Sequence, residues 1–209
     1  MTFSVRSDFP ATLPATHTEY CFSCHQTGTL TAHRIDGKKM YTCSACGTTN
    51  QRLLIYDPAM VSYFDTQDRL VHEGCGVIPV RSDGKLLLFQ RVKYPFLLTI
   101  PAGHLEPNED PMVCAAREMT EEIGITPIAL EQIFTGPIEG DSCMGGADIH
   151  FWHAYIAVLD TTVTPHLTGD EGREWGWYGL DELNETNAVQ PLLHMLADET
   201  VREKLANLH

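Results

Sequence analysis

The stretch from residue 103 to residue 125, GHLEPNEDPMVCAAREMTEEIGI, constrains the fold of this chain more than any other part. Residues 112–123 favour a helix whose inward positions are expected to be Ala115, Ala116, Met119 and Ile123. On such a helix three carboxylates share one face, because they stand at i, i+3 and i+4: Glu118, Glu121 and Glu122. Carboxylates this close repel one another unless basic groups or hard cations neutralise them, and their oxygens suit Mg²⁺ or Mn²⁺. The alternative is a solvated acidic helix face, which would not need the glycines of the flanking loops.

This stretch resembles the Nudix box at every defined position of that motif. The matching residues are Gly103, Glu109, Arg117, Glu118, Glu121, Glu122 and Gly124, with Met119 and Ile125 in the aliphatic positions. Residues 74–78 look like the first core strand of the family, and residues 86–91 look like the next strand. The resemblance implies an α/β fold, a mixed-sheet α/β/α sandwich, with a metal site on the box helix.

The resemblance also implies roles for individual residues. The carbonyl of Gly103 and the carboxylates of Glu118, Glu121 and Glu122 would bind Mg²⁺ or Mn²⁺, and Glu118, Glu122 and Arg117 would be catalytic. Arg117 and Glu109 would hold the ligating carboxylates in position, since a guanidinium can fork onto a carboxylate. A plain structural ion pair between Arg117 and Glu109 is the alternative.

Many Nudix enzymes use a further glutamate from a loop beyond the box. Glu174 stands three residues before Trp177, which resembles the family's Glu-x-x-Trp passage into its closing strand. Glu174 is therefore predicted to be a metal ligand and catalytic group, and it is favoured over Glu171. The alternative is that both are solvated loop acids.

Four of the seven cysteines form two CxxC pairs: Cys21, Cys24, Cys43 and Cys46. In a reducing compartment this spacing is typical of a tetrahedral Zn²⁺ site, with a redox pair or an empty thiol site as alternatives. The segments 30–35 and 39–41 flank an Asp36-Gly37 turn and predict a hairpin. The pattern resembles a zinc ribbon. The remaining cysteines are scattered and unpaired by spacing, and Cys75 and Cys114 are expected to be buried apolar residues.

The predicted organisation has four parts: an N-terminal extension (1–18), a zinc ribbon (19–50), a linker (51–69) and a Nudix hydrolase domain (70–209). Strands of the last part are predicted at 75–80, 86–91, 129–135, 149–157 and 177–179, and a final helix at 190–208. A ribbon of this size cannot build a hydrophobic core, so one structural Zn²⁺ would supply its folding free energy.

The charge balance limits the partners. With 28 acidic against 14 basic residues the net charge is −14, which disfavours general nucleic-acid binding and a membrane surface. No apolar run approaches the ~20 residues of a transmembrane span, and the N-terminus lacks the pattern of a secretory signal. We therefore expect a cytoplasmic protein. The ribbon is expected to be structural or to support a homodimer, with nucleic-acid contact as the alternative.

The predicted function is divalent-metal-dependent hydrolysis of the diphosphate bridge of a nucleoside diphosphate derivative, of the ADP-ribose or dinucleotide type, releasing a nucleoside monophosphate. A ribbon before a Nudix domain is similar to the architecture of NADH pyrophosphatases, but residues 126–141 lack their Ser-Gln-Pro-Trp-Pro-Phe motif. Several side chains could stack on a base or meet a phosphate, with core or rim positions as the alternative: Phe134, Phe151, Trp152, Trp175 and Arg91. The alternative function is a non-catalytic, ligand-sensing Nudix-fold module.

Overall fold

The structure is a computed structural model that describes residues 14–208 except 68, 169 and 171. Its centre is a mixed sheet of eight strands whose main path runs β11-β12-β7-β8-β13. These strands are β7 (Leu70–Arg81), β8 (Leu86–Arg91), β11 (Glu131–Glu139), β12 (Ile149–Leu159) and β13 (Gly172–Tyr178). β12 runs parallel to β7, and the other neighbours on this path are antiparallel. Three short strands extend the sheet: β6 (Ser62–Phe64), β9 (Leu98–Thr99) and β10 (Ala102–His104).

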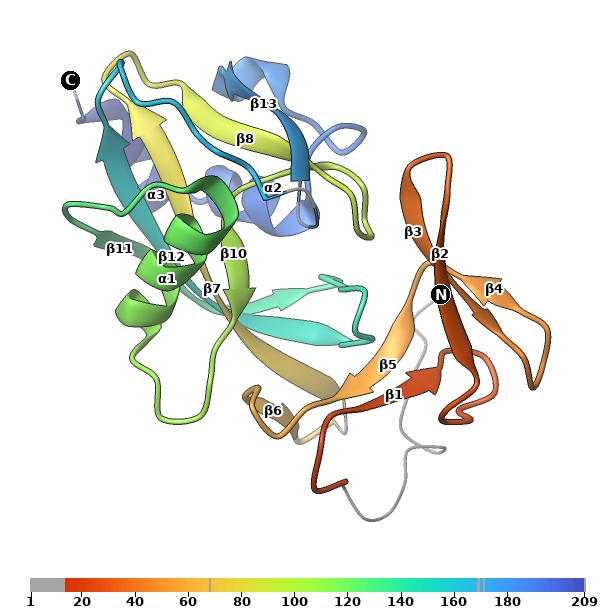
Figure 1. Cartoon of the computed structure of the whole chain (residues 1–209). Helices are drawn as coiled ribbons and strands as arrows, with labels where there is room; N and C mark the ends of the chain where they lie inside the picture. The colour runs from red at the N-terminus through yellow and green to blue at the C-terminus, as the bar shows by residue number, and fades with distance from the viewer. Residues whose placement is uncertain (1–13, 68, 169, 171, 209) are drawn as a thin grey trace.

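Helices cover both faces of this sheet (Figure 1). α1 (Pro111–Ile123) lies on one face, and α2 (Gln190–Ala197) and α3 (Glu199–Ala206) lie on the other. Side chains of β7 and β8 alternate between two apolar clusters, as the period of a strand requires. Ile78 and Leu88 pack toward α2 and α3, whereas Val77 and Phe89 pack toward α1. The predicted α/β/α sandwich is confirmed.

The box helix α1 begins and ends where its capping residues stand. Asp110 accepts hydrogen bonds from the backbone N–H groups of Met112 and Val113, at 2.9 and 3.3 Å. Gly124 takes a left-handed conformation at φ 70° and donates its N–H to the carbonyl of Thr120. Of the inward positions predicted from the sequence, Ala115, Met119 and Ile123 are buried, and Ala116 is half-buried.

The prediction of one C-terminal helix over 190–208 is wrong in one respect, because the helix is broken at Asp198. This residue has extended backbone angles, and its carboxylate caps the second helix by accepting from the N–H groups of Thr200 and Val201, at 2.8 and 3.3 Å. A side chain that satisfies the free N–H groups of a new helix favours a restart over continuation. β13 also starts earlier than the predicted strand at 177–179, because it pairs with β8 from Gly172 onward.

The N-terminal part forms two small sheets. β1 (Thr18–Cys21) pairs with β5 (Leu53–Tyr56), and β2 (Leu30–Ile35), β3 (Lys38–Cys43) and β4 (Thr49–Asn50) form the other sheet. The predicted hairpin is confirmed by the pairing of β2 with β3. The segment expected to be a linker contributes β5 to the first small sheet and β6 to the central sheet.

The N-terminal part contacts the main domain through the loop between β11 and β12. Leu53 and Ile55 of β5 donate their N–H groups to the carbonyls of Met144 and Gly145, each at 2.9 Å. Arg52 donates from Nε to the carbonyl of Cys143 at 2.7 Å. These hydrogen bonds join β5 to the loop, which lies beside it in Figure 1. None of the helices in the described part of the chain has the length and apolar content of a membrane-spanning helix.

Candidate active site

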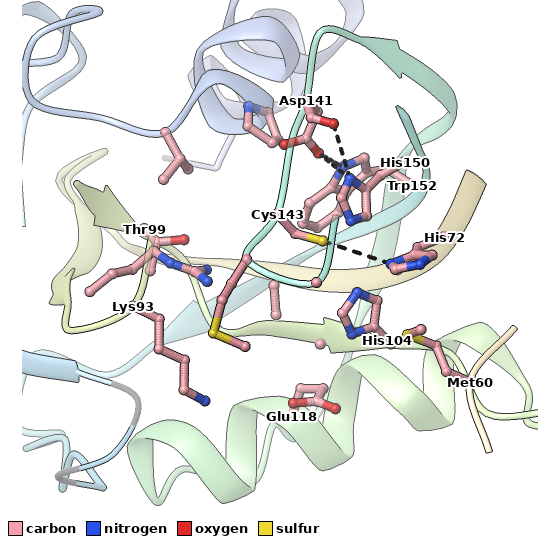
Figure 2. Close-up of a pocket in the computed structure, with 18 of the residues that line it drawn as sticks. Met60, His72, Lys93, Thr99, His104, Glu118, Asp141, Cys143, His150 and Trp152 are labelled. Atoms are coloured by element: carbon pink, nitrogen blue, oxygen red, sulfur yellow. Dashed lines mark hydrogen bonds and ion pairs between the residues drawn. The ribbon is translucent and has the colours of Figure 1, made fainter. Parts of the chain in front are cut away.

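A cavity of about 470 Å³ lies between α1, β10, the β11–β12 loop and the N-terminal strand β5. Glu118 and Glu122 reach it from α1, and Gly103 reaches it from β10. Ile55 and Asp57 close it from the N-terminal part. The N-terminal part is therefore a wall of this cavity and not a separate appendage. Figure 2 shows the cavity with Glu118 on its helix below the histidines.

Glu118 lies directly against the backbone of Gly103. A Cβ added at Gly103 would stand 2.1 Å from the carboxylate carbon of Glu118, so only glycine permits this approach. Burial raises the pKa of Glu118 above its ordinary value, and Arg117 offsets this effect by its charge and hydrogen bond. A cation bound beside Glu118 would stabilise the charged form of its carboxylate.

Glu122 is the most buried carboxylate of the box helix, at 8% exposure. Its Oε2 accepts a hydrogen bond from the backbone N–H of Ala102 at 2.9 Å. This bond joins α1 to β10 and fixes one oxygen of the carboxylate at the cavity wall. Glu118 and Glu122, one helical turn apart, therefore both line the cavity.

Arg117 connects three of the box carboxylates. It donates from Nε to Oε1 of Glu109 at 3.0 Å and from Nη2 to Oε2 at 3.1 Å, and from Nη1 to Glu118 at 2.5 Å. Nη1 also lies 3.3 Å from Glu121. The fork lies on Glu109, and the remaining nitrogen bonds to Glu118, whereas the sequence led us to expect the fork on a carboxylate that binds metal.

Glu121 lies apart from the other two carboxylates. Its side chain is 61% exposed, against 12% for Glu118, and it is not among the described residues that line the cavity. Glu118 and Glu122 are the two glutamates on the side of the helix that contacts β10. Glu121 lies further round the helix and faces solvent.

Glu174 is not brought to the box carboxylates. It is exposed, takes a left-handed backbone conformation at φ 52°, and occupies a bulge where the pairing of β13 with β8 shifts register. It does not line the cavity among the described residues. The sequence pattern behind the prediction was an acidic residue three positions before Trp177. This pattern does not record the bulge, at which the side chain of Glu174 is exposed to solvent. Glu171 lies outside the described residues.

The four cysteines of the two CxxC pairs gather at one point of the N-terminal part. Their ligand atoms all lie within 4.8 Å of one another. The Sγ atoms of Cys21 and Cys46 are 3.7 Å apart, as are those of Cys24 and Cys43. Sulfur atoms bound tetrahedrally at about 2.3 Å from zinc are about 3.8 Å apart. The cluster is compatible with a small zinc ribbon.

A second group with metal-ligand chemistry was missed by sequence reasoning. We call it the histidine–cysteine cluster, and its members are His72, His104, Cys143 and His150. All four line the same cavity as Glu118. The treatment of Cys143 as a scattered cysteine is corrected by this grouping. No spacing could reveal it, because the four residues come from four separate segments.

Two of the residues considered for base or phosphate contacts line the cavity. These are Trp152 and Arg91, and Lys93 lines it as well. The indole Nε1 of Trp152 donates to Oδ2 of Asp141 at 2.7 Å. The other three candidates are not among the described residues that line the cavity: Phe134, Phe151 and Trp175. Cationic side chains and an aromatic ring therefore accompany the carboxylates.

The family model of the NUDIX domain matches residues 70–198 of this chain. An ADP-ribose pyrophosphatase from Bacillus subtilis (strain 168) is 36% identical over 73 residues, which are 32% of this chain and 40% of that protein. The methanol dehydrogenase activator of Bacillus methanolicus is 31% identical over 81 residues, 37% of this chain and 36% of the activator. The matched part is thus about two fifths of the length of each relative or less.

Solved structures share the fold at lower identity. A MutT NUDIX hydrolase from Burkholderia pseudomallei is 24% identical with a TM-score of 0.53, covering 62% of this chain and 98% of its own. The NUDIX domain of Shewanella oneidensis NrtR, solved with ADP ribose, is 21% identical with a TM-score of 0.52, covering 64% and 87%. Since the family match spans more than half of the sequence and includes the box helix and the five strands on the main path of the central sheet, the chain belongs to the NUDIX domain family.

Proposed function

We propose that this protein is a divalent-metal-dependent pyrophosphohydrolase that cleaves the diphosphate bridge of a nucleoside diphosphate derivative and releases a nucleoside monophosphate. The observation that carries the proposal is the pairing of Glu118 and Glu122 on one cavity wall with the backbone of Gly103 against Glu118. This donor set consists of hard oxygen atoms, which fits Mg²⁺ or Mn²⁺.

In this proposal Glu118, Glu122 and the carbonyl of Gly103 hold the divalent ion, with Glu121 at the solvent edge of the site. The ion supplies charge neutralisation of the diphosphate and an activated water when it is bound. Arg117, through its fork onto Glu109 and its bond to Glu118, keeps the ligating carboxylate in position. The N–H of Ala102 does the same for Glu122.

The substrate class is proposed as ADP-ribose or a related dinucleotide. Arg91 and Lys93 supply positive charge for phosphate oxygens, and Trp152 supplies an aromatic surface at the cavity. The sequence similarity to an ADP-ribose pyrophosphatase supports this class. We also infer one structural Zn²⁺ in the four-cysteine ribbon, a homodimer and a cytoplasmic location, from the sequence arguments above.

Turnover by Glu122→Gln, compared with Glu121→Gln, tests the proposal. Both changes keep the size of the side chain, but only the first removes a carboxylate that lines the cavity. With ADP-ribose, NADH, diadenosine polyphosphates and nucleoside triphosphates as substrates and Mg²⁺ or Mn²⁺ present, Glu122→Gln should abolish most of the turnover while the chain remains folded. Glu121→Gln should retain more of it.

Reaction in ¹⁸O-water identifies the bond that is cleaved. The label should enter a phosphate of the products, since attack occurs at phosphorus. Binding of ADP-ribose without metal-dependent turnover of any substrate in the panel would instead favour the non-catalytic module.

A further inference from the structure

The histidine–cysteine cluster is formed by three neighbouring strands and one loop. His72 stands on β7, His150 on β12 and His104 on β10, and Cys143 stands in the β11–β12 loop. The pairing register sets His150 directly opposite His72, while His104 pairs with Gly74 two residues further along β7. Figure 2 shows the thiol of Cys143 and the imidazoles of His72, His104 and His150 gathered in one corner of the cavity. These side chains are far apart in the sequence, and they come together because β10 and β12 both pair with β7.

The separations within the cluster match those of ligands on one small ion. The ligand atoms of all four residues lie within 4.8 Å of one another. Sγ of Cys143 is 3.7 Å from Nδ1 of His72. A sulfur and a nitrogen bound tetrahedrally to zinc, at about 2.3 and 2.05 Å, are separated by about 3.6 Å.

One ring nitrogen of the buried His72 has no hydrogen-bond partner among the described residues. This atom is Nε2, and the side chain is fully buried. Burying an imidazole this way costs free energy unless another interaction compensates. Binding an ion through the other ring nitrogen, Nδ1, which faces Cys143, would offset this cost, although Nε2 itself stays unpaired among the described residues.

His150 is oriented as a metal-binding histidine is. Its Nδ1 lies 3.2 Å from Oδ2 of Asp141 and 3.3 Å from the carbonyl of the same residue. Asp141 is in turn held by the indole N–H of Trp152. A carboxylate or carbonyl on one imidazole nitrogen fixes the ring and leaves the other nitrogen to bind a metal, which is the usual arrangement around zinc.

We propose that the histidine–cysteine cluster binds a Zn²⁺ ion, separate from the ribbon ion and from the divalent ion of the box carboxylates. Three imidazoles and a thiolate are a borderline-soft donor set, which favours Zn²⁺ over Mg²⁺. Four protein ligands complete a tetrahedral shell, so the ion is structural.

The position of the cluster defines what the ion would do. Cys143 is the cluster member on the β11–β12 loop, and the next two residues of that loop accept the hydrogen bonds of β5. The ion would therefore fix this loop on the central sheet and, through the loop, seat the N-terminal part at the cavity. This inference does not depend on the proposed hydrolysis.

Zinc content of the full-length protein after dialysis against a weak chelator is the first test. We expect about two Zn²⁺ per chain for the parent, and about half of that in Cys143→Ala and in the ribbon variant Cys46→Ala. His153→Gln is a matched control, since it stands on β12 near His150 but contacts Thr135 and Glu73. It should retain the full zinc content. A content near one that is unchanged by Cys143→Ala overturns the proposal.

X-ray absorption at the zinc edge tests the same claim without a variant of the cluster itself, so a failure of Cys143→Ala to fold cannot obscure it. Scattering from both sulfur and imidazole is expected for the parent, and Cys46→Ala should shift the average shell toward imidazole. A shell of sulfur alone in the parent contradicts the proposal. Alkylation mapped by mass spectrometry adds a third measurement: Cys143 should be protected until zinc is removed by a strong chelator. Rapid alkylation in zinc-replete protein would identify a reactive thiol instead, and would also overturn the site.

Discussion

Arg117 forks onto Glu109, with its Nε 3.0 Å from Oε1 and its Nη2 3.1 Å from Oε2, while its remaining nitrogen bonds to Glu118. Two parallel hydrogen bonds define the plane of the guanidinium, so the nitrogen that reaches Glu118 has one direction available. The pair therefore orients a carboxylate of the candidate metal site and does more than neutralise charge.

Replacing Arg117 by Lys should separate orientation from charge. Lysine keeps the positive charge but cannot fork, so we expect turnover or metal affinity to fall by ~10–100-fold. The control is Arg81→Lys, because Arg81 pairs with Asp83 in a surface turn away from the cavity. Steady-state kinetics across a Mg²⁺ titration measures the effect. Equal activities of the two variants would remove the orienting role.

The close approach of Glu118 to Gly103 should make this glycine intolerant of any side chain. In Gly103→Ala the new Cβ meets the Glu118 carboxylate at 2.1 Å, so one of them must move. A displacement of about 1 Å in a catalytic group can reduce activity by ~10²-fold, which is the loss we expect. Measuring thermal unfolding alongside kinetics separates this local effect from general destabilisation. Full activity in a folded variant would show that the approach is dispensable.

The Glu109–Arg117 pair should also give a defined pH dependence of stability. The hydrogen bond from Arg117 is the main cause that lowers the pKa of Glu109 below its ordinary value of 4.5. A carboxylate with a lowered folded-state pKa contributes stability that is present above 4.5 and is lost as the pH falls through the lowered value. The difference in unfolding free energy between the parent and Glu109→Gln should therefore be largest near neutral pH and shrink in acid. Chemical denaturation of both proteins from pH 7 downward measures it, and a constant difference would contradict the assignment.

Zinc removal should affect the N-terminal part first. Among the described residues, its own apolar cluster has two buried members, Tyr20 and Leu54, so it has little core to replace the metal. Under a strong chelator, hydrogen exchange should accelerate in β1 to β4, whereas the core of β7 and β8 should keep its protection. Cys24→Ser should reproduce this change without chelator, and Cys75→Ser, at a cysteine buried against α1, should not. Unchanged exchange in β1 to β4 after verified loss of zinc would argue against a folding role for the ion.

Glu174→Gln tests the loop glutamate favoured by the sequence. A placed acid–base group contributes about 10²–10⁴-fold to a rate. Because Glu174 is exposed on a bulge and does not line the cavity, we expect its variant to keep turnover within a few-fold of the parent at saturating metal. Glu171→Gln serves as the companion variant. A loss of ~10²-fold in Glu174→Gln would mean that this strand rearranges when substrate binds and brings the carboxylate to the site.

Features that depend on the spacing of nearby residues could be predicted before the structure was known. The box helix and the hairpin could be predicted because helix and strand periods repeat within a few residues, and the α/β/α sandwich was implied by the resemblance of residues 103–125 to the Nudix box. The CxxC pairs likewise bring their four cysteines together through short turns. Asp198 shows where local reasoning failed: a helix-compatible apolar pattern continued past a residue whose side chain caps a new helix.

Which of these residues lie close together depends on how the elements pack in three dimensions. It separated Glu121 from Glu118 and Glu122, because contact with β10 selects one edge of the helix face. A register shift at the β13 bulge turned Glu174 outward. The histidine–cysteine cluster depends on the register between β7 and β12, on the pairing of β10 and on the path of one loop. Such contacts join segments distant in the chain, and the free energy that selects them comes from packing the whole sheet, which no local pattern records.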